Sequence, residues 1–539
     1  MMMQERTDIP LLHVTALPPS TKWRVTVGWL SLLALAVLGF FFVLLLTPHG
    51  IGVSPDSVTY IEGARSLLRG FGYVSSLPHG QVKPITDWPP LFSSSLALIG
   101  LSGVDPWIAA RWLNSFLLAV NIFLTGHLAK RYSNGSSTAA LLAGILLLVS
   151  YDFLNVHRMA WSEPLFISLT LLGFTFILKY LEIPKSWLLL TSALFMSLAF
   201  LTRYFAAPLI GATALSILFL KTGTARTRLR DSACFMLLAV VPMLCWCVRN
   251  RIVSGQVAGL LPGYIGLPHS LLEGLLASCT RWFFYIPGRL PVVLAGFVRT
   301  LPFLLFLYAL LLLVPRIRRN AASKSFIIFI VLQSFCYVIF YVFLCVFISN
   351  GCASSVRRYM TPLHPLAVVV FVLVIVEHVR LFQRRRLLMS LGLLLCILVI
   401  GMNIRLSSNK GLLARRSNGR GYASRAFRES PTIKAVASLP DGAFIASNNP
   451  NAILFLTRRG VAYFPHIYDP HRNNMPRDDY DAQIELLRRQ CTNGNCFFVV
   501  FDESTKSAPY LAAPEQLIKD LSLAKVLECK DGSIYKPRQ

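Results

Sequence analysis

Acidic residues are scarce in this chain of 539 residues, which has 25 aspartates and glutamates against 52 lysines and arginines. Charged residues of both signs make up 14% of the sequence, whereas a soluble protein typically carries about 25%. This shortage of charge argues against a soluble protein, and the hydrophobic fraction of 55% places most of the chain in lipid. The net charge of +27 does not point to a nucleic-acid partner. Many basic residues lie in short loops beside apolar runs, where they set membrane orientation.

Several common site motifs are also missing. The 11 cysteines show no metal-ligand spacing, and most lie in apolar segments, where cysteine behaves as a small hydrophobic residue. Only Cys491 and Cys496 lie close together in a polar loop, where they suggest a disulfide and an oxidising compartment. The sequence has no G-x-G-x-x-G or P-loop pattern, and no His, Asp or Glu cluster with ligand spacing. We therefore expect no nucleotide site and no required metal or other cofactor.

Long apolar runs take the place of charge along the first three quarters of the chain. A helix needs roughly 20 residues to cross the hydrocarbon core. The runs predict eleven transmembrane helices, at about 25–47, 107–128, 137–152, 163–180, 186–202, 205–220, 232–249, 291–314, 325–348, 362–379 and 387–403. With a cytoplasmic N-terminus, the basic clusters after all the even-numbered helices fall on the cytoplasmic side. This orientation exports the loop 48–106 and everything beyond 403.

Two domains follow from this pattern: a transmembrane domain over 1–403 and a small extracytoplasmic α/β domain over 404–539. The tail alternates predicted helices at 425–438, 452–459, 480–490 and 514–521 with predicted strands at 443–447, 461–465 and 497–502. Residues 524–529 and 533–535 flank Asp531-Gly532, a preferred hairpin turn. A small α/β sandwich fits this order.

The exported loop 48–106 is too long for a passive connector. Its segment 56–69 has helical periodicity, and we interpret it as an amphipathic helix on the outer membrane surface. Asp56 at its start would lie at the depth of a lipid head group. Local pattern equally allows Asp56 to be only the N-cap of that helix.

A second exported carboxylate, Glu163, begins the fourth predicted span, just before Pro164. It too has a capping interpretation, because the helix dipole favours a carboxylate there. Together, Asp56 and Glu163 form a plausible pair for positioning or deprotonating an acceptor hydroxyl.

Exported basic residues complete the candidate site. Arg203 interrupts an apolar stretch between two predicted helices, where a charge is costly and a phosphate partner would offset that cost. For any single basic residue of this set, the alternative is that its charged end extends to the membrane interface without binding a phosphate. As a set they suit a phosphate-linked donor: Lys83, Arg158, Arg203, Arg249, Arg251, Arg357 and Arg358.

An ordered set of short motifs carries a family resemblance. These are Asp56-Ser-Val-Thr-Tyr60, Trp88-Pro-Pro-Leu-Phe92, Ser162-Glu-Pro-Leu-Phe166, Leu201-Thr-Arg-Tyr204 and Arg358-Tyr-Met-Thr-Pro-Leu-His-Pro365. In this order, on this topology, the chain resembles the GT-C class of membrane glycosyltransferases, in particular the group of protein O-mannosyltransferases and the bacterial lipid A aminoarabinose transferase.

The resemblance implies a GT-C fold and transfer of a sugar from a polyprenyl-phosphate donor to a hydroxyl of a lipid, glycan or protein. It implies that Asp56 is the general base of an inverting reaction, and that Glu163 binds the acceptor or orients the first loop. Lys83 resembles a phosphate-contacting lysine of the family, although here Ile-Thr-Asp-Trp separates Lys83-Pro84 from Pro89-Pro90. The remaining candidates for substrate or phosphate contact are Asp87, Arg158, Arg203, Arg358 and Tyr359. The small tail resembles bacterial members, which implies the bacterial cytoplasmic membrane.

Three other functions stay open at this point. An O-antigen ligase or polymerase would carry a large loop late in the chain rather than an Asp-bearing first loop. A lipid-linked-sugar transporter or flippase would usually show paired repeats and broken helices at mid-membrane, but here the polar residues gather at the outer helix ends. The third alternative is a scaffold without catalytic activity.

Overall fold

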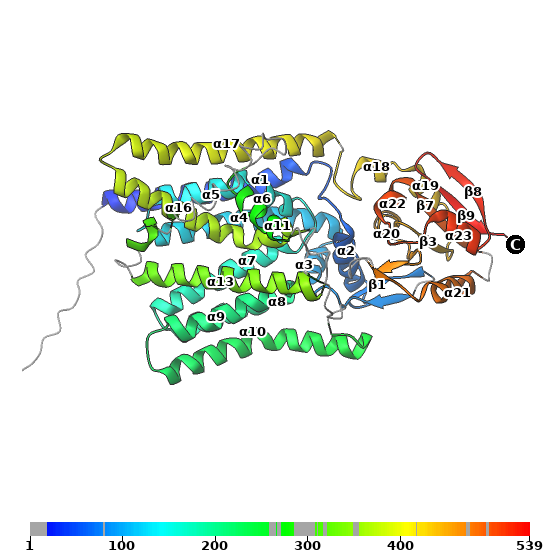
Figure 1. Ribbon diagram of the computed structural model, residues 1–539, viewed down its shortest axis with the longest axis horizontal. Helices are drawn as coiled ribbons and strands as arrows, with labels where there is room; N and C mark the ends of the chain where they lie inside the picture. The colour runs from blue at the N-terminus through cyan, green and yellow to red at the C-terminus, as the bar shows by residue number, and fades with distance from the viewer. Residues whose placement is uncertain are drawn as a thin grey trace, which may run out of the picture.

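The computed structural model describes residues 19–78, 81–257, 266, 271–284, 308–309, 311–315, 321–348, 355–416, 418–469, 475–491 and 495–538. A bundle of long helices forms one end of the molecule and a small α/β domain forms the other, with part of the segment 48–105 between them (Figure 1).

Apolar helices build the bundle, and seven spans in the described part of the chain are long and apolar enough to cross a membrane. The long helices are α1 (Pro19–Leu46), α4 (Pro106–Tyr132), α7 (Glu163–Glu182), α10 (Ala225–Ser254), α13 (Ala321–Phe347), α16 (His364–Phe382) and α17 (Arg386–Arg416). The short helix α15 (Val356–Met360) and the 3-10 turn Thr361–Leu363 lead into α16 and belong to its span. The protein is therefore a multi-pass integral membrane protein.

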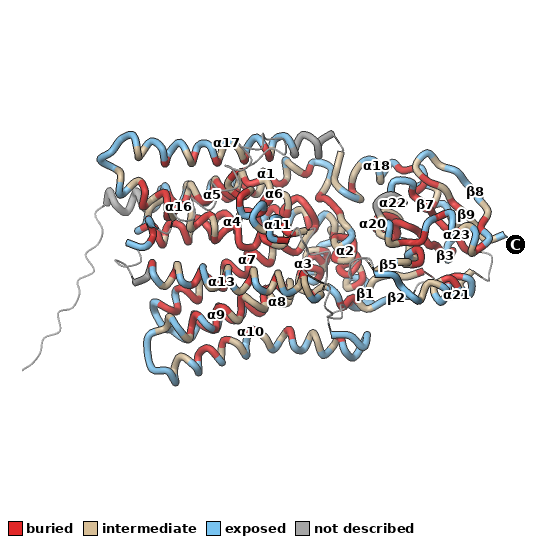
Figure 2. Tube along the Cα trace, in the orientation of Figure 1, coloured by how far each residue is buried: buried red, intermediate tan, exposed pale blue. Residues whose placement is uncertain are grey.

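Shorter helices fill the bundle between these spans. They are α5 (Ser137–Val149), α6 (Tyr151–His157), α8 (Ser186–Thr202), α9 (Ala206–Leu220) and α11 (Leu271–Arg281). The single helix predicted over 137–152 is bent by 67° between α5 and α6, and this pair counts as an eighth span if the two are taken together. The other predicted segments within the described residues are helical, whereas 291–314 falls largely outside them. Burial is concentrated in the middle of the bundle, and α1, α10 and α17 each expose one apolar side (Figure 2).

The segment between α1 and α4 forms a small layer on the end of the bundle. It contains α2 (Pro55–Leu68), the antiparallel pair β1 (Val74–Ser76) and β2 (Val82–Pro84), and α3 (Leu91–Gly100). The expectation that 56–69 lies on the membrane surface is wrong, because α2 is buried on more than one side. Tyr60 and Glu62 are 1% and 2% exposed, and α20 (Pro450–Thr457) of the C-terminal domain packs on α2.

The C-terminal domain is a three-layer α/β structure, as the sequence predicts. Its mixed sheet has the order β4 (Ala462–Tyr463), β3 (Phe444–Ser447), β7 (Cys496–Phe501), β9 (Gly532–Pro537) and β8 (Leu523–Cys529). Strand β3 is parallel to β4 and β7, whereas β9 is antiparallel to β7 and β8. One apolar core lies under α19 (Pro431–Ala437) and α20 (Pro450–Thr457), and another under α21 (Tyr480–Gln490) and α23 (Pro514–Asp520).

Smaller elements complete this domain: α18 (Arg425–Arg428), α22 (Asp502–Ser507) and the pair β5 (Tyr468–Asp469) and β6 (Met475–Pro476). The helix predicted over 425–438 is two helices, α18 and α19, because Pro431 begins the second one. Cys491 and Cys496 form a disulfide. Helix α17 continues past residue 403 and ends at Arg416, so the compact part of the tail begins after the predicted boundary.

Candidate active site

Asp56 lies in the first turn of α2, with its side chain turned toward the bundle. Ser54 is the N-cap of this helix: its hydroxyl accepts a hydrogen bond from the amide of Ser57, at 3.4 Å. The alternative that Asp56 serves only as the cap is therefore wrong. Its Oδ2 instead accepts a hydrogen bond from Nη1 of Arg358, at 2.5 Å, across 302 residues of sequence.

Glu163 begins α7 and is 1% exposed. Its Oε1 lies 3.0 Å from Nη1 of Arg203 and also accepts a hydrogen bond from Nε of Arg358. A buried carboxylate needs such partners, because taking a charge out of water costs several kcal/mol. Glu163 thus serves as a counter-charge for two arginines in addition to beginning a helix.

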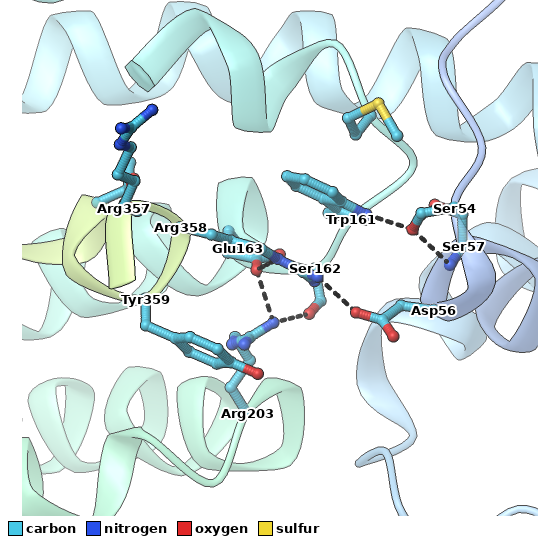
Figure 3. Close-up of polar contacts among 12 residues, drawn as sticks. Ser54, Asp56, Ser57, Trp161, Ser162, Glu163, Arg203, Arg357, Arg358 and Tyr359 are labelled. Carbon is cyan, nitrogen blue, oxygen red and sulfur yellow. Dashed lines mark hydrogen bonds and ion pairs between the residues drawn. The ribbon is translucent and has the colours of Figure 1, made fainter. Parts of the chain in front are cut away.

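Arg358 therefore bridges the two carboxylates through different nitrogen atoms, Nε to Glu163 and Nη1 to Asp56 (Figure 3). Its guanidinium also lies over the ring of Trp161, with Cζ 3.9 Å from the ring centroid. Trp161 in turn donates from Nε1 to the hydroxyl of Ser54, at 2.7 Å. This links the guanidinium to the start of the helix that carries Asp56.

The hydroxyl groups of Ser162 and Tyr60 also belong to this centre. The hydroxyl of Ser162 accepts from Nη1 of Arg203 at 3.0 Å and lies 2.9 Å from the hydroxyl of Tyr60. Burial raises the pKa of Tyr60 above its ordinary value, so its phenol stays protonated. The centre thus has two fixed carboxylates, two fixed guanidinium groups and neutral hydroxyls between them.

A cavity of about 690 Å³ lies beside this centre, within the range of small-molecule sites. Trp161 and Arg358 form part of its wall, next to Arg357. The wall of the cavity also contains two acidic residues, Asp152 and Glu273. Asp152 is paired with Arg281 at 3.2 Å. The full lining is Tyr151, Asp152, Asn155, Val156, Trp161, Glu273, Gly274, Ala277, Ser278, Ser355, Val356, Arg357, Arg358 and Thr361.

The other residues proposed from the sequence lie at different distances from this centre. Tyr359 stacks on Phe205 with ring centroids 5.0 Å apart, and Arg203 lies over its ring. Lys83 on β2 and Asp87 after it are exposed and do not line the cavity. Arg158 is buried, and it is a lining residue of a separate small pocket instead.

The C-terminal domain covers the outer side of α2. Phe455 of α20 packs edge-on against Trp107, with ring centroids 5.6 Å apart, and Arg458 pairs with Asp105 at 3.2 Å. Asp105 also binds Arg65 of α2, at 3.1 Å. The helix that carries Asp56 is therefore held between the bundle and the C-terminal domain.

No group of three or more His, Cys, Asp or Glu side chains is placed to hold a metal ion within the described ranges. The residues that sequence reasoning missed are Ser54, Tyr60 and Trp161. They lie inside or next to the matching motifs, but a hydrogen bond or ring contact between segments 107 residues apart leaves no signal in a single sequence.

Comparisons with known proteins bear on the family and the fold. The protein family described as dolichyl-phosphate-mannose-protein mannosyltransferase matches residues 87–247. No curated protein sequence matches the chain significantly.

Solved structures match almost the whole chain. ArnT from Cupriavidus metallidurans bound to undecaprenyl phosphate is 14% identical, with a TM-score of 0.50 over 96% of this chain and 98% of that one. AglB from Archaeoglobus fulgidus, in complex with an inhibitory peptide and a dolichol-phosphate, is 12% identical, with a TM-score of 0.55 over 97% and 75%. The mycobacterial arabinofuranosyltransferase AftD is 14% identical, with a TM-score of 0.52 over 94% of this chain and 40% of that one. The expected fold class is confirmed: the chain has the GT-C fold, with a small C-terminal α/β domain.

Proposed function

Proceeding from the GT-C fold, we propose that this membrane protein is an inverting glycosyltransferase. It moves a sugar from a polyprenyl-phosphate donor to a hydroxyl of a lipid, glycan or protein on the extracytoplasmic side of the membrane. The observation that carries the proposal is the bridge that Arg358 makes between Asp56 and Glu163 at the wall of a cavity of about 690 Å³. The matching family and the structural neighbours are glycosyltransferases, or proteins solved with a polyprenyl phosphate.

Asp56 is the proposed general base. Its side chain is 28% exposed, whereas that of Glu163 is 1% exposed, so only Asp56 combines a charged partner with access for a second substrate. In the proposed step, Asp56 takes the proton of the acceptor hydroxyl while the oxygen attacks the anomeric carbon. The bond between that carbon and the phosphate oxygen breaks, and the polyprenyl phosphate leaves with the bonding electrons. A single displacement of this kind inverts the anomeric configuration.

Arg358 is the proposed phosphate ligand. Its Nε and Nη1 bind carboxylates, and the guanidinium has further donors for a phosphate oxygen. Arg357 lines the same cavity and adds a second cation. Negative charge grows on the phosphate as the sugar leaves, so cations fixed there stabilise the transition state more than the ground state.

Glu163 and Arg203 are proposed positioning residues. Arg203 shares Oε1 of Glu163 with Arg358, and both arginines therefore keep a fixed relation to that carboxylate. Because Arg358 also binds Asp56, Glu163 sets the position of the base indirectly. This refines the expectation that Glu163 orients the first loop.

The proposed location is the bacterial cytoplasmic membrane, with the N-terminus in the cytoplasm and the C-terminal domain outside. It rests on the basic clusters at one end of the spans, for example Arg226, Arg228 and Arg230 near the start of α10. The active centre and the C-terminal domain lie at the opposite end of the bundle (Figure 1).

Binding of a polyprenyl phosphate, the leaving group of the proposed reaction, tests the proposed phosphate contact of Arg358. Purified full-length protein is titrated with a polyprenyl phosphate, using wild type, Arg358→Gln and the control Arg425→Gln, whose side chain is 60% exposed in the C-terminal domain. Loss of charge-assisted hydrogen bonds worth about 1.5–3 kcal/mol should weaken binding about tenfold or more in Arg358→Gln alone. Equal binding by all three proteins would contradict the proposed phosphate contact. In a separate sugar-transfer assay, a product that retains the donor's anomeric configuration would contradict the proposed inverting reaction.

A further inference from the structure

The segment just before Asp56 is clamped between two other segments of the chain. Gly52 pairs in parallel with Met159 on one side, and Val53 pairs in parallel with Gly421 on the other. The amide of Gly52 donates to the carbonyl of Arg158 at 2.9 Å, and the amide of Val53 donates to that of Arg420 at 3.1 Å. The clamp therefore brings two arginines from distant parts of the sequence to the two sides of Gly52.

The space at Gly52 is too small for a side chain. A Cβ there would lie 2.3 Å from the sulfur of Met159 and 3.0 Å from Cβ of Arg420. The backbones that carry Arg158 and Arg420 are consequently held close together on the two sides of Gly52.

Arg158 is 2% exposed, and its Nε and Nη2 have no hydrogen-bond partner among the described residues. Burial and the like charge of Arg420 lower the pKa of Arg158, to about 10. Arg420 binds the neutral amide oxygen of Asn155, at 2.7 Å. Burying a guanidinium without a counter-charge costs several kcal/mol, and an anion bound beside Arg158 would offset this cost.

A small pocket of about 10 Å³ has both arginines among its lining residues. His49, Arg158 and Arg420 line it, and no acidic residue is among the lining residues. A volume of about 10–15 Å³ holds one water-sized group, such as a single oxygen of a larger anion whose remainder stays outside. Pro48 and His49, which also line the pocket, are exposed, so the pocket reaches the surface of the protein.

We propose that Arg158 and Arg420 form a binding site for the phosphate group of a membrane lipid, separate from the proposed catalytic centre. The pocket lies at the end of α1, where a transmembrane helix meets the head-group region. Phe41 and Leu45 of the same helix are 54% and 61% exposed, and they offer an apolar surface for the acyl chains. The bound phosphate would neutralise the arginine pair and join the bundle to the linker that leads into the C-terminal domain.

Native mass spectrometry of the purified full-length protein, titrated with phosphatidylglycerol, tests this site. The variants are Arg158→Gln, Arg420→Gln and the control Arg405→Gln, which removes an exposed arginine of α17 outside the pocket. We expect one tightly bound lipid in wild type and in Arg405→Gln, and about tenfold weaker binding in both pocket variants. If Arg158→Gln does not fold, Arg420→Gln still decides the question, because Arg420 is only partly buried.

Equal lipid binding by all four proteins would overturn the proposal. A second arm measures thermal unfolding in lipid-free micelles with inorganic phosphate or with chloride alone. If either ion protects the wild type as well as phosphatidylglycerol does, and Arg420→Gln removes that protection, the pocket holds a free anion and the lipid assignment is wrong. Displacement of phosphatidylglycerol by equimolar polyprenyl phosphate would likewise show that the site is not separate from the donor site.

Discussion

The two carboxylates of the proposed active centre should respond differently when each is neutralised. Asp56→Asn keeps a side-chain oxygen that can still accept a hydrogen bond from Arg358, and Asp56 is 28% exposed, so the cost in stability should be about 1–2 kcal/mol. The loss of a general base should lower kcat by about 10² to 10⁴-fold, which corresponds to roughly 3–5 kcal/mol of barrier. Asp56→Asn should therefore be folded and nearly inactive.

Glu163→Gln should instead destabilise the protein. Glu163 is 1% exposed and is the counter-charge of both Arg203 and Arg358, so its neutralisation leaves two partly buried cations with less compensation. Removing one partner of a buried ion pair typically costs about 3–5 kcal/mol. The activity of Glu163→Gln should also fall, because Arg358 loses the contact that fixes it beside Asp56.

Thermal unfolding in detergent, combined with a sugar-transfer assay on the same preparations, separates the two roles. The expected order of melting temperature is wild type, then Asp56→Asn close to it, then Glu163→Gln well below both. If Asp56→Asn unfolds as early as Glu163→Gln, Asp56 is a structural residue and the division of roles is refuted. If Glu163→Gln keeps both full stability and full activity, the bridge through Arg358 has no function.

Three further expectations concern the segment before Asp56 and the C-terminal domain. Gly421→Ala would place a Cβ 1.9 Å from the carbonyl of Val53 at a φ of +57°, so it should displace the segment leading to Asp56 and lower kcat without affecting detergent extraction. Phe455→Ala removes a 6% exposed ring between α20 and α2 at a cost of about 3 kcal/mol, and limited proteolysis should then release the C-terminal domain faster. Burial raises the pKa of Asp531, but hydrogen bonds from the start of α19 outweigh it and the folded pKa is lowered below 3.8. Its stabilising contribution is therefore complete above pH 3.8 and is lost as the pH falls through the folded value, and near-UV circular dichroism should show less acid sensitivity in Asp531→Asn.

Local sequence pattern predicted most elements of the fold. Apolar runs located the spans because a lipid-exposed helix must be apolar over its whole length. The order of strands and helices in the C-terminal domain followed from periodicity, and helix 480–490 was predicted with its observed bounds. The prediction for α2 failed because the partner of its second face, α20, lies almost 400 residues further along the chain, and hydrophobic periodicity does not reveal what covers a helix.

Part of the candidate centre had been selected from the sequence. Asp56, Glu163, Arg203 and Arg358 were all selected from the sequence, and the fold brings them together across as many as 302 residues. Their exact pairing had no sequence signal, because ion pairs between distant helices depend on how the bundle packs. Arg158 belonged to the same predicted set, but the clamp around Gly52 places it in a different pocket, with Arg420.

Transfer of labelled sugar from a panel of polyprenyl-phosphate sugars, in membranes containing equal amounts of wild type or Asp56→Asn, tests the central claim most directly. We expect wild type to transfer sugar from at least one donor, with inversion, and Asp56→Asn to transfer none. Equal transfer by both proteins would remove Asp56 as the base, and no transfer from any donor would contradict the assignment as a polyprenyl-phosphate-dependent glycosyltransferase.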